Sequence, residues 1–404
     1  MRKDVLIIII LLFVSCSKDE TPEFSGVERT VIVYMAADND LSGDALVDLE
    51  EMKRSYKDAG VNLIVLMDMA GEDPYLLRIT EGDSETIKAY PEFDSADPAN
   101  MNSLLREIIE MYPSDDYGLI LWSHGTSWLP AGMQLKSFAR DGNRQMDIPE
   151  LAEALPLWFG FILFDACLMG SVEVAYELKD KTDYIIASSG ETIYEGFPYD
   201  LIIPELIKQQ PDFRKVAESY FTYYNEQENE LYRSATISVV NTRELEALAT
   251  VTAQAIAGQA FDMTTFDRLS VQRLDVYAEQ YTFDFMDFVN RTFPETDKSA
   301  LTEQLNRAVL YKAHTAGFIG LYDIDTFCGL SCYIPHPSRD DLNSYYLHLN
   351  WSKASGFVNL FDNREEGINI PAPESRTNVE PINKIQPRQD NLSEQRNPKD
   401  LLPP

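Results

Sequence analysis

The most regular feature of the chain is a series of short apolar runs separated by stretches with helical spacing. Buried strands are predicted where every position is apolar or nearly so, at 31–38, 61–68, 117–122, 160–165 and 184–187. Helices are predicted where apolar residues recur every three or four positions, at 41–56, 101–111, 148–155 and 172–178. Apolar strands that alternate with helices are typical of a mostly parallel sheet covered on both faces. The sequence therefore predicts an α/β protein with its functional residues at the carboxyl ends of the strands.

Beyond residue 200 the pattern becomes mainly helical. Helices are predicted at 200–209, 212–229, 241–259, 284–292 and 299–313. Strands are predicted at 234–240, 317–322 and 330–334, in addition to a weaker, exposed strand at 75–80. Residues 365–404 hold seven Pro and no aromatic residue, a composition that predicts disorder. The predicted division is a signal peptide (1–15), a tether (16–29), a catalytic core (30–200), a helical extension whose late strands complete the core (201–364) and a tail (365–404).

The first residues have the features of an export signal. Arg2 and Lys3 precede ten apolar residues, Val5–Val14, which are too few to span a bilayer and suit a signal-peptide core. Ser15-Cys16 after this core resembles the bacterial lipoprotein signal, which implies a lipid on Cys16. Residues 17–20 resemble the export tag of Bacteroidetes lipoproteins. We expect a membrane anchor through an N-terminal lipid and a place on the outer membrane, at the cell surface. The alternatives are its periplasmic face or a secreted protein with an ordinary signal peptide.

Composition and charge narrow the class of protein. The chain has 404 residues, 45% hydrophobic and 25% charged, as globular proteins do. Lys and Arg number 34 against 66 Asp and Glu, and the resulting charge of −32 repels phosphate backbones, which argues against nucleic-acid binding. Cys328 and Cys332 would lie roughly 13 Å apart on one strand, too far for a disulfide, so we expect buried thiols. No metal-ligand spacing is found in the sequence.

Candidate chemistry follows two of the predicted strands. His124 and Gly125 follow the strand 117–122 after Ser123, and Cys167 follows the strand 160–165 after Ala166. If these strands are neighbours, a thiolate nucleophile and an imidazole that holds its proton meet at one sheet edge. The N–H groups of Gly125 and Cys167 could then form an oxyanion hole, and a helix at 170–179 would favour the thiolate through its dipole. Each residue alone is more often a buried packing or structural group, so only their coincidence favours catalysis.

These residues resemble a known family. The runs Tyr-Gly-Leu-Ile-Leu-Trp-Ser-His-Gly at 117–125 and Phe-Asp-Ala-Cys-Leu-Met-Gly at 164–170 look like the clostripain family of cysteine peptidases. The segments at 33–41, 187–199 and 329–335 are also similar to parts of that family. The resemblance implies a caspase-like three-layer α/β/α sandwich and a monomer. It also implies a Cys-His dyad, with Cys167 as the nucleophile and His124 as the general base.

The resemblance further implies an endopeptidase that acts on proteins or peptides after Arg or Lys. In that family the Asp two residues before the catalytic Cys lies at the floor of the primary specificity pocket, and here this is Asp165. A buried carboxylate suits a substrate cation, although Asp165 could instead hold loop N–H groups. Glu191 and Glu195 are candidates for the pocket wall, and Trp128 could line a subsite. The sequence leaves the choice between Arg and Lys open.

Members of the family commonly cut themselves between the His and Cys strands. The polar segment 130–147 contains Lys136, Arg140 and Arg144, and the resemblance favours processing after Arg140 or Arg144. No cofactor is required in this interpretation. Some members respond to calcium, but Asp141 and Asp147 form no recognisable calcium loop. The competing interpretations are a catalytically inactive binding lipoprotein with the same fold, and a related hydrolase or transpeptidase that uses the same dyad.

Overall fold

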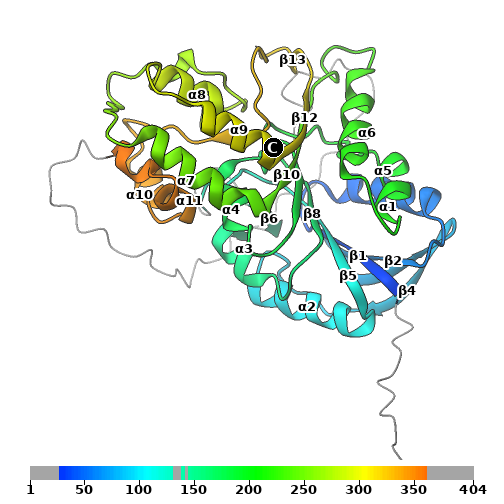
Figure 1. Ribbon diagram of the computed structural model, residues 1–404. Coiled ribbons are helices and arrows are strands. Elements are labelled where there is room, and N and C mark those ends of the chain that lie inside the picture. The colour runs from blue at the N-terminus through cyan, green and yellow to red at the C-terminus, as the bar shows by residue number, and fades with distance from the viewer. Residues whose placement is uncertain (1–26, 131–137, 142–143, 362–404) are drawn as a thin grey trace, which may run out of the picture.

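The protein is built around a nine-stranded sheet, seen in a computed structural model that describes residues 27–130, 138–141 and 144–361 (Figure 1). The strand order is β12-β10-β9-β8-β5-β1-β2-β3-β4. The five central strands are parallel: β1 (Val27–Ala37), β2 (Val61–Met69), β5 (Ser114–Trp122), β8 (Phe161–Asp165) and β9 (Tyr184–Ala187). Antiparallel strands flank them: β3 (Tyr75–Thr80) and β4 (Asp83–Ala89) at one edge, β10 (Thr236–Asn241) and β12 (Val309–His314) at the other.

Helices cover both faces of this sheet. One face packs on α1 (Ser42–Ser55), α5 (Tyr199–Leu206) and α6 (Phe213–Asn225). The other core cluster includes α2 (Pro98–Met111), α3 (Ile148–Ala154), α4 (Val172–Glu177), α7 (Leu245–Ile256), α8 (Phe285–Thr292), α9 (Ser299–Ala308), α10 (Asp340–Tyr346) and α11 (Asn350–Ala354). Successive residues of β1 alternate between the two clusters, as the pleat requires: Val31 and Val33 face the first, Ile32 and Tyr34 the second. The predicted three-layer α/β/α sandwich is confirmed.

Short strands form three small sheets outside the main one. They pair β6 (Phe138–Asp141) with β7 (Arg144–Met146), β11 (Phe283–Asp284) with β15 (Ser331–Cys332), and β13 (Gly317–Phe318) with β14 (Tyr322–Asp323). Single 3-10 turns occur at Thr242–Glu244, Arg268–Ser270 and Phe357–Phe361. The β6–β7 pair lies next to β1 and so belongs to the surroundings of the carboxyl sheet edge.

Some predicted elements beyond residue 200 are wrong. The helix predicted at 299–313 ends at Ala308, and Val309–His314 is instead the edge strand β12, paired with β10. The strands predicted at 317–322 and 330–334 shrink to two-residue pairs that do not join the main sheet. The main sheet is extended by β10 and β12. These errors arise because an edge strand that is only half buried lacks the continuous apolar run of a central strand.

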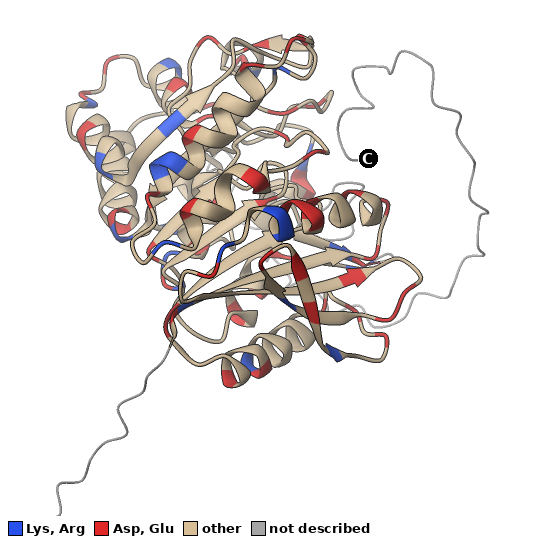
Figure 2. Ribbon diagram, turned by 90° about the vertical axis from the view of Figure 1, so that its right-hand side faces the viewer, with Lys and Arg blue, Asp and Glu red and all other residues tan. Residues whose placement is uncertain are grey.

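The structure also bears on the predictions for the chain ends, for membrane-spanning helices, for the cysteines and for the distribution of charge. The lipidation site Cys16 and the tail 365–404 lie outside the described residues, and so does the predicted tether 16–29 apart from its last three residues, which begin β1 instead. Within the described residues, no helix combines the length and apolarity needed to cross a membrane. Cys328 and Cys332 are buried free thiols, as expected. Asp and Glu are spread over helices, strands and loops, with Lys and Arg scattered among them (Figure 2).

Candidate active site

The carboxyl ends of β5 and β8 lie side by side. The strands are parallel neighbours in which Trp122 is opposite Asp165, and the Ser123 N–H donates to the Asp165 carbonyl at 3.3 Å. His124 and Cys167 each follow two residues after these paired positions, so the chain brings both to the same rim of the sheet. The two strands that precede His124 and Cys167 are therefore neighbours, as the sequence argument required.

Gly125 allows the two segments to touch. A Cβ atom at this position would lie 2.6 Å from the Cys167 carbonyl oxygen and 3.0 Å from the Ala166 Cβ. Real Cβ atoms do not approach backbone oxygens so closely, because repulsion rises steeply inside van der Waals contact. Only glycine fits here without pushing the loop after β5 away from the loop that carries Cys167.

The Cys167 thiol is held at the start of a strained turn. Its exposed fraction is 7%, its Sγ donates to the Thr192 carbonyl at 3.6 Å, and it accepts the Thr192 N–H at 3.3 Å. The next residue, Leu168, has a φ of 64°, a left-handed conformation that is costly for a branched side chain. The Leu168 N–H donates to the Gly190 carbonyl at 2.8 Å, which fixes this turn and with it the direction of the preceding side chain.

His124 contacts a carboxylate that the sequence argument did not find. Its Nε2 lies 3.2 Å from the Asp40 Oδ1, and the Arg140 Nη1 lies 3.2 Å from the same oxygen. The Arg140 backbone is fixed as well: its N–H donates to the Ser123 Oγ at 3.2 Å, and its carbonyl accepts from the Asn39 Nδ2 at 2.8 Å. The signal that could have identified Asp40 is its place just after β1, at the same edge of the sheet.

Asp165 lies at a small cavity beside the thiol. The cavity holds about 20 Å³ and is lined by Leu41, Trp122, Ser123, Asp165, Ala166, Cys167, Thr192, Ile193, Tyr194 and Gly196. The Asp165 Oδ2 accepts the Phe197 N–H at 3.1 Å and the Tyr199 hydroxyl at 3.0 Å. Since a water molecule needs about 10–15 Å³ measured in this way, the cavity has room for about one water and is too small for an Arg or Lys side chain.

Burial controls the charge state of Asp165. Desolvation raises the pKa of Asp165 to about 6, and the nearby Glu51 charge adds to this rise. The two hydrogen bonds act in the opposite direction and lower the pKa. Burial also raises the pKa of the Asp48 carboxyl, and repulsion from Asp165 contributes. The Trp122 Nε1 donates to Asp48 at 2.7 Å. Two buried carboxyls with raised pKa values make this a region where an added positive charge would be stabilised.

The two glutamates predicted for the pocket wall differ in their surroundings. Glu191 is not among the residues that line the cavity, and its Oε1 accepts the Val276 N–H at 2.8 Å. Desolvation and the Asp275 charge raise its pKa to about 8, so it holds its proton at neutral pH. Glu195 is half-buried next to Tyr194, which does line the cavity. Neither glutamate lines the cavity, but Glu195 stands between two residues that do, Tyr194 and Gly196.

Other residues singled out in the sequence have the following places. Arg144 is 50% exposed and pairs with Asp97 at 2.8 Å, while Lys136 lies outside the described residues. The helix expected at 170–179 is shorter, Val172–Glu177, and begins five residues after Cys167. The suggestion that Trp128 lines a subsite is wrong.

Trp128 belongs to the core. It is 1% exposed and packs on Tyr333, Tyr345 and Tyr346 at ring-centroid distances of 4.8, 6.3 and 4.9 Å. These aromatic residues come from the C-terminal part of the chain, which the sequence alone did not place against the loop after β5. The ring therefore fastens that loop to the core.

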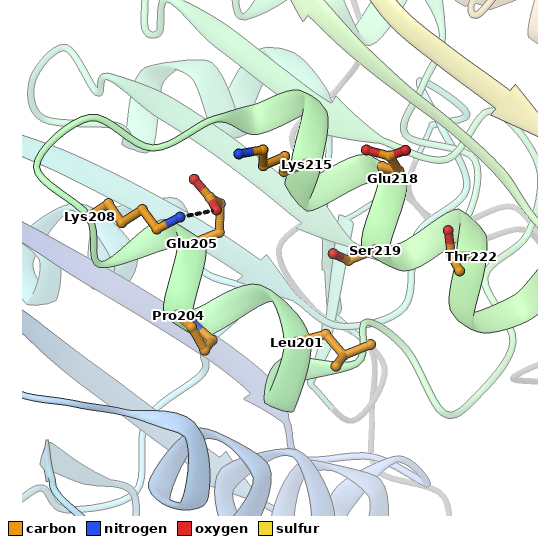
Figure 3. Close-up of a pocket in the computed structure, with 8 residues that line it drawn as sticks. All are labelled: Leu201, Pro204, Glu205, Lys208, Lys215, Glu218, Ser219 and Thr222. Atoms are coloured by element: carbon orange, nitrogen blue, oxygen red, sulfur yellow. Dashed lines mark hydrogen bonds and ion pairs between the residues drawn. The ribbon is translucent and has the colours of Figure 1, made fainter.

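A larger cavity lies away from this chemistry. It holds about 440 Å³ between α5 and α6 and is lined by Leu201, Pro204, Glu205, Lys208, Lys215, Glu218, Ser219 and Thr222 (Figure 3). Lys208 is paired with Glu205 inside it. None of the candidate catalytic residues lines it, so its size alone does not identify it as an active site.

Comparison with known proteins places the chain in a family. The model of the clostripain family, Peptidase_C11, matches residues 33–346. The chain belongs to the clostripain family. Clostripain of Hathewaya histolytica is 32% identical over 225 residues, which cover 44% of this chain and 42% of that protein. The match thus spans less than half of the length of this curated relative.

Solved structures agree over a larger part of the chain. An inactive zymogen C11 protease from Parabacteroides distasonis is 31% identical, with a TM-score of 0.73, and the match covers 81% of this chain and 97% of that one. A secreted C11 cysteine protease from Bacteroides thetaiotaomicron, solved with an irreversible peptide inhibitor, is also 31% identical with a TM-score of 0.73. That match covers 82% of this chain and 99% of the other. The resemblance to clostripain-type cysteine peptidases seen in the sequence is confirmed.

Proposed function

We propose that this clostripain-family chain is an endopeptidase that uses Cys167 as nucleophile and His124 as general base. The observation that carries the proposal is the pairing of β5 with β8, which brings the two strand ends to one rim. The Cys167 sulfur would attack the substrate carbonyl carbon, and the proton lost by the thiol would pass through His124 to the leaving amine. Water would then hydrolyse the thioester. Because the His124 Nε2 faces Asp40, Nδ1 is the nitrogen that would exchange the proton.

The oxyanion of the tetrahedral intermediate would be stabilised by the N–H groups of Gly125 and Cys167. The close approach of these two segments supports this assignment. Backbone donors fixed in advance cost no reorganisation during the reaction, which is the main source of such stabilisation.

The proposed substrates are proteins or peptides with Arg or Lys at P1. Asp165 would pair with the substrate cation, with Glu195 as a second acidic group at the pocket. Since the cavity beside Cys167 has room for only about one water, the segment 192–196 would have to move outward before a basic side chain can enter. A cation reaching Asp165 would stabilise its ionised form and offset the desolvation that now raises its pKa.

The principal test uses the chain without its signal peptide. Release of a fluorophore from peptides ending in Arg or Lys is measured for the wild type, Cys167→Ala and His124→Ala, with Cys328→Ser and His348→Ala as matched controls. The proposal expects turnover by the wild type and both controls and none by the two site variants. No turnover by the thiol-reduced, processed wild type would favour the alternative, an inactive binding lipoprotein.

Selectivity has its own test. Asp165→Ala should lose the preference for a basic P1 residue over a neutral residue of similar length, and Glu191→Gln should keep it. Unchanged selectivity in Asp165→Ala would move the role to Glu195 or Glu191.

We further propose that the precursor is cut after Arg140 or Arg144. Arg144 is the more exposed of the two side chains, at 50% against 31%, which favours its peptide bond as the accessible one. N-terminal sequencing of the larger, C-terminal fragment should give a start at Gln145 or Asp141. A start at any other residue would refute both sites.

The location of the protein is proposed from its first residues. A lipid on Cys16 would anchor the chain at the outer membrane, with the catalytic part at the cell surface. Radiolabelled palmitate should label the wild type and leave Cys16→Ala unlabelled. Labelling that persists in Cys16→Ala would refute the anchor, and protease digestion of intact cells separates the surface from the periplasmic face.

A further inference from the structure

The loop after β9, residues 188–198, contacts the Cys167 sulfur. The Thr192 N–H donates to Sγ at 3.3 Å, and Sγ donates to the Thr192 carbonyl at 3.6 Å. The Leu168 N–H, next to Cys167, donates to the Gly190 carbonyl at 2.8 Å. Glu191 lies between these two contacts in the sequence, so whatever fixes Glu191 also fixes the loop against the sulfur.

The side chain of Glu191 is turned into the protein. It is buried, and its Oε1 accepts the Val276 N–H at 2.8 Å, which joins the loop after β9 to the segment 274–277. Its Oε2 is buried too and has no hydrogen-bond partner among the described residues. A buried carboxyl with an oxygen in this position is costly when it is ionised and much less so when it holds a proton.

A second buried carboxyl, Asp275, directly precedes Val276. Its two oxygens accept hydrogen bonds at 2.6–3.1 Å from the N–H groups of Tyr277, Tyr281 and Thr282 and from the Thr282 hydroxyl. Desolvation raises the pKa of Asp275, whereas the backbone donors and Arg273, 3.9 Å away, lower it. These donors stabilise the ionised form of Asp275. Of the two carboxyls, Glu191 is therefore the one that holds a proton.

Two tyrosines and one arginine also face this pair. Burial raises the pKa of Tyr277 and of Tyr322, and the Glu191 charge adds to both rises; the Cys167 charge adds to that of Tyr277. The Arg273 guanidinium lies over the Tyr322 ring, 5.2 Å from its centroid, and lowers the pKa of Glu191 slightly against desolvation and the Asp275 charge. With one guanidinium for two carboxyls, these groups are neutral together when Glu191 is protonated.

We propose that Glu191, in its protonated form, is a positioning residue that holds the loop after β9 against Cys167. Loss of the proton to solvent would leave a second negative charge beside Asp275, with Oε2 buried and unpartnered among the described residues. The carboxylate would turn toward water and carry Thr192 away from the sulfur. Since the pKa of Glu191 is raised to about 8, this displacement would occur as the pH rises through that value. The effect on catalysis rests on the proposed function, whereas the displacement does not.

The first experiment measures kcat/KM on an Arg peptide at several pH values, with the chain without its signal peptide. In the wild type we expect a fall of at least about tenfold between about pH 7 and 9.5, as the proton leaves Glu191. Glu191→Gln is neutral at every pH and can accept the Val276 N–H, so it should keep the activity near pH 7 and shift this fall by at least about one pH unit. Glu191→Ala loses the contact, and its kcat/KM should be about tenfold lower near pH 7. Glu110→Gln, an exposed acid, should keep the wild-type profile.

Two results of this experiment would overturn the positioning role. One is the same alkaline fall in Glu191→Gln as in the wild type, because the amide has no proton to lose in this range. The other is full activity in Glu191→Ala, because the contact with Val276 would then be dispensable. The comparison of the wild type with Glu191→Gln decides the matter even if Glu191→Ala does not fold.

The second experiment does not depend on turnover. Mass spectrometry follows the alkylation of Cys167 by iodoacetamide in the wild type and in Glu191→Gln, with buried Cys332 as an internal control. Thiolate formation raises both rates with pH, so their ratio isolates Glu191. We expect the ratio of wild type to variant to rise at least about threefold between about pH 7 and 9, because the displaced loop uncovers the sulfur. A constant ratio would overturn the proposal. A rising ratio in a protein that cleaves no peptide would refute the proposed function and leave the role of Glu191 standing.

Discussion

At the scale of single residues, the candidate site depends on carboxylates whose roles follow from their neighbours. Asp40 shares one oxygen between His124 and Arg140. Asp165 is buried, with two donors to one of its oxygens. The same chemical group therefore contacts an imidazole in one place and accepts two buried hydrogen bonds in the other.

Removal of the Asp40 charge should slow the reaction more than it weakens binding. Asp40→Asn keeps the shape of the side chain but cannot balance the positive charge that His124 takes up during proton transfer. We expect kcat to fall about tenfold with little change in KM, the magnitude of one charge interaction near a protein surface. Steady-state kinetics on an Arg peptide tests this, with Asp115→Asn as a control. A change confined to KM would assign Asp40 to substrate binding instead.

Binding of basic substrates should weaken in acid. The pKa of Asp165 is raised to about 6, so the carboxylate is ionised above that pH and protonated below it. We expect KM for Arg and Lys peptides to rise as the pH falls from 7 to 5, because a neutral carboxyl attracts a cation poorly. The same titration of Asp165→Asn should show a flat KM over this range. An equal rise in both proteins would assign the effect to another group.

At the scale of secondary-structure elements, the site depends on how closely the ends of neighbouring strands approach. The ends of β5 and β8 are in contact at Gly125, and α4, which follows Cys167, is tied to the C-terminal part of the chain by Glu173. The sequence predicts where each of these segments lies along the chain. It does not predict how closely they approach one another in space.

A side chain at Gly125 should separate the catalytic groups. In Gly125→Ala the new Cβ would meet the Cys167 carbonyl at 2.6 Å, so one of the two loops must shift. Since a displacement of about 1 Å can cost a hundredfold in rate, we expect kcat/KM to fall by about that factor. Gly43→Ala is the control, because its Cβ meets nothing within 4 Å. Activity in Gly125→Ala equal to that of the control would show that this spacing is not critical.

Glu173 should make the fold more stable in acid than in alkali. It is fully buried, and its Oε1 accepts the Tyr333 N–H at 2.9 Å and the Tyr346 hydroxyl at 2.8 Å. Desolvation raises its pKa to about 7, above the unfolded value, so the native state binds the proton more tightly. Its contribution is complete below about pH 4.5 and is lost as the pH rises through 7, on the order of 3 kcal/mol.

Glu173→Gln should flatten this dependence. The amide oxygen can accept the same two hydrogen bonds, and the side chain has no charge to desolvate. Urea unfolding between pH 5 and 8 gives the comparison, and wild-type and variant curves that remain parallel would contradict the assignment.

At the scale of the whole molecule, the dominant feature is the excess of negative charge. The net charge of −32 is spread over the elements, as Figure 2 shows for one side. A field of this sign attracts basic substrates before contact and raises their rate of encounter.

Added salt should therefore slow the cleavage of basic peptides selectively. We expect kcat/KM for a peptide with several lysines to fall severalfold between about 0.02 and 0.5 M sodium chloride, because the Debye length shrinks from about 20 to about 4 Å. A peptide with one basic residue at P1 and compensating acids should be much less affected. Equal salt dependence of the two peptides would show that the field plays no part.

The sequence by itself determined the layers of the fold and the pair of residues that carry the proposed chemistry. Strands that are apolar throughout identified the central sheet, and the polar residues just after two of them identified His124 and Cys167. The predicted sheet is confirmed, and both residues follow neighbouring strands, because burial and the end of a strand are local properties of the chain. The edge strand β12 was predicted as part of a helix. It is only half buried, so its hydrophobic pattern resembles that of a helix more than that of a central strand.

Only the tertiary structure decided which side chains meet across segments. Three contacts join positions that lie tens to hundreds of residues apart in the sequence. Asp40 contacts His124, Trp128 packs under three tyrosines, and Glu191 accepts a hydrogen bond from Val276. The convergence of Asp38, Glu92 and Asp141 is of the same kind. Such contacts depend on the order of strands in the sheet and on how loops pack over its edge, and the hydrophobic pattern of a single segment contains neither.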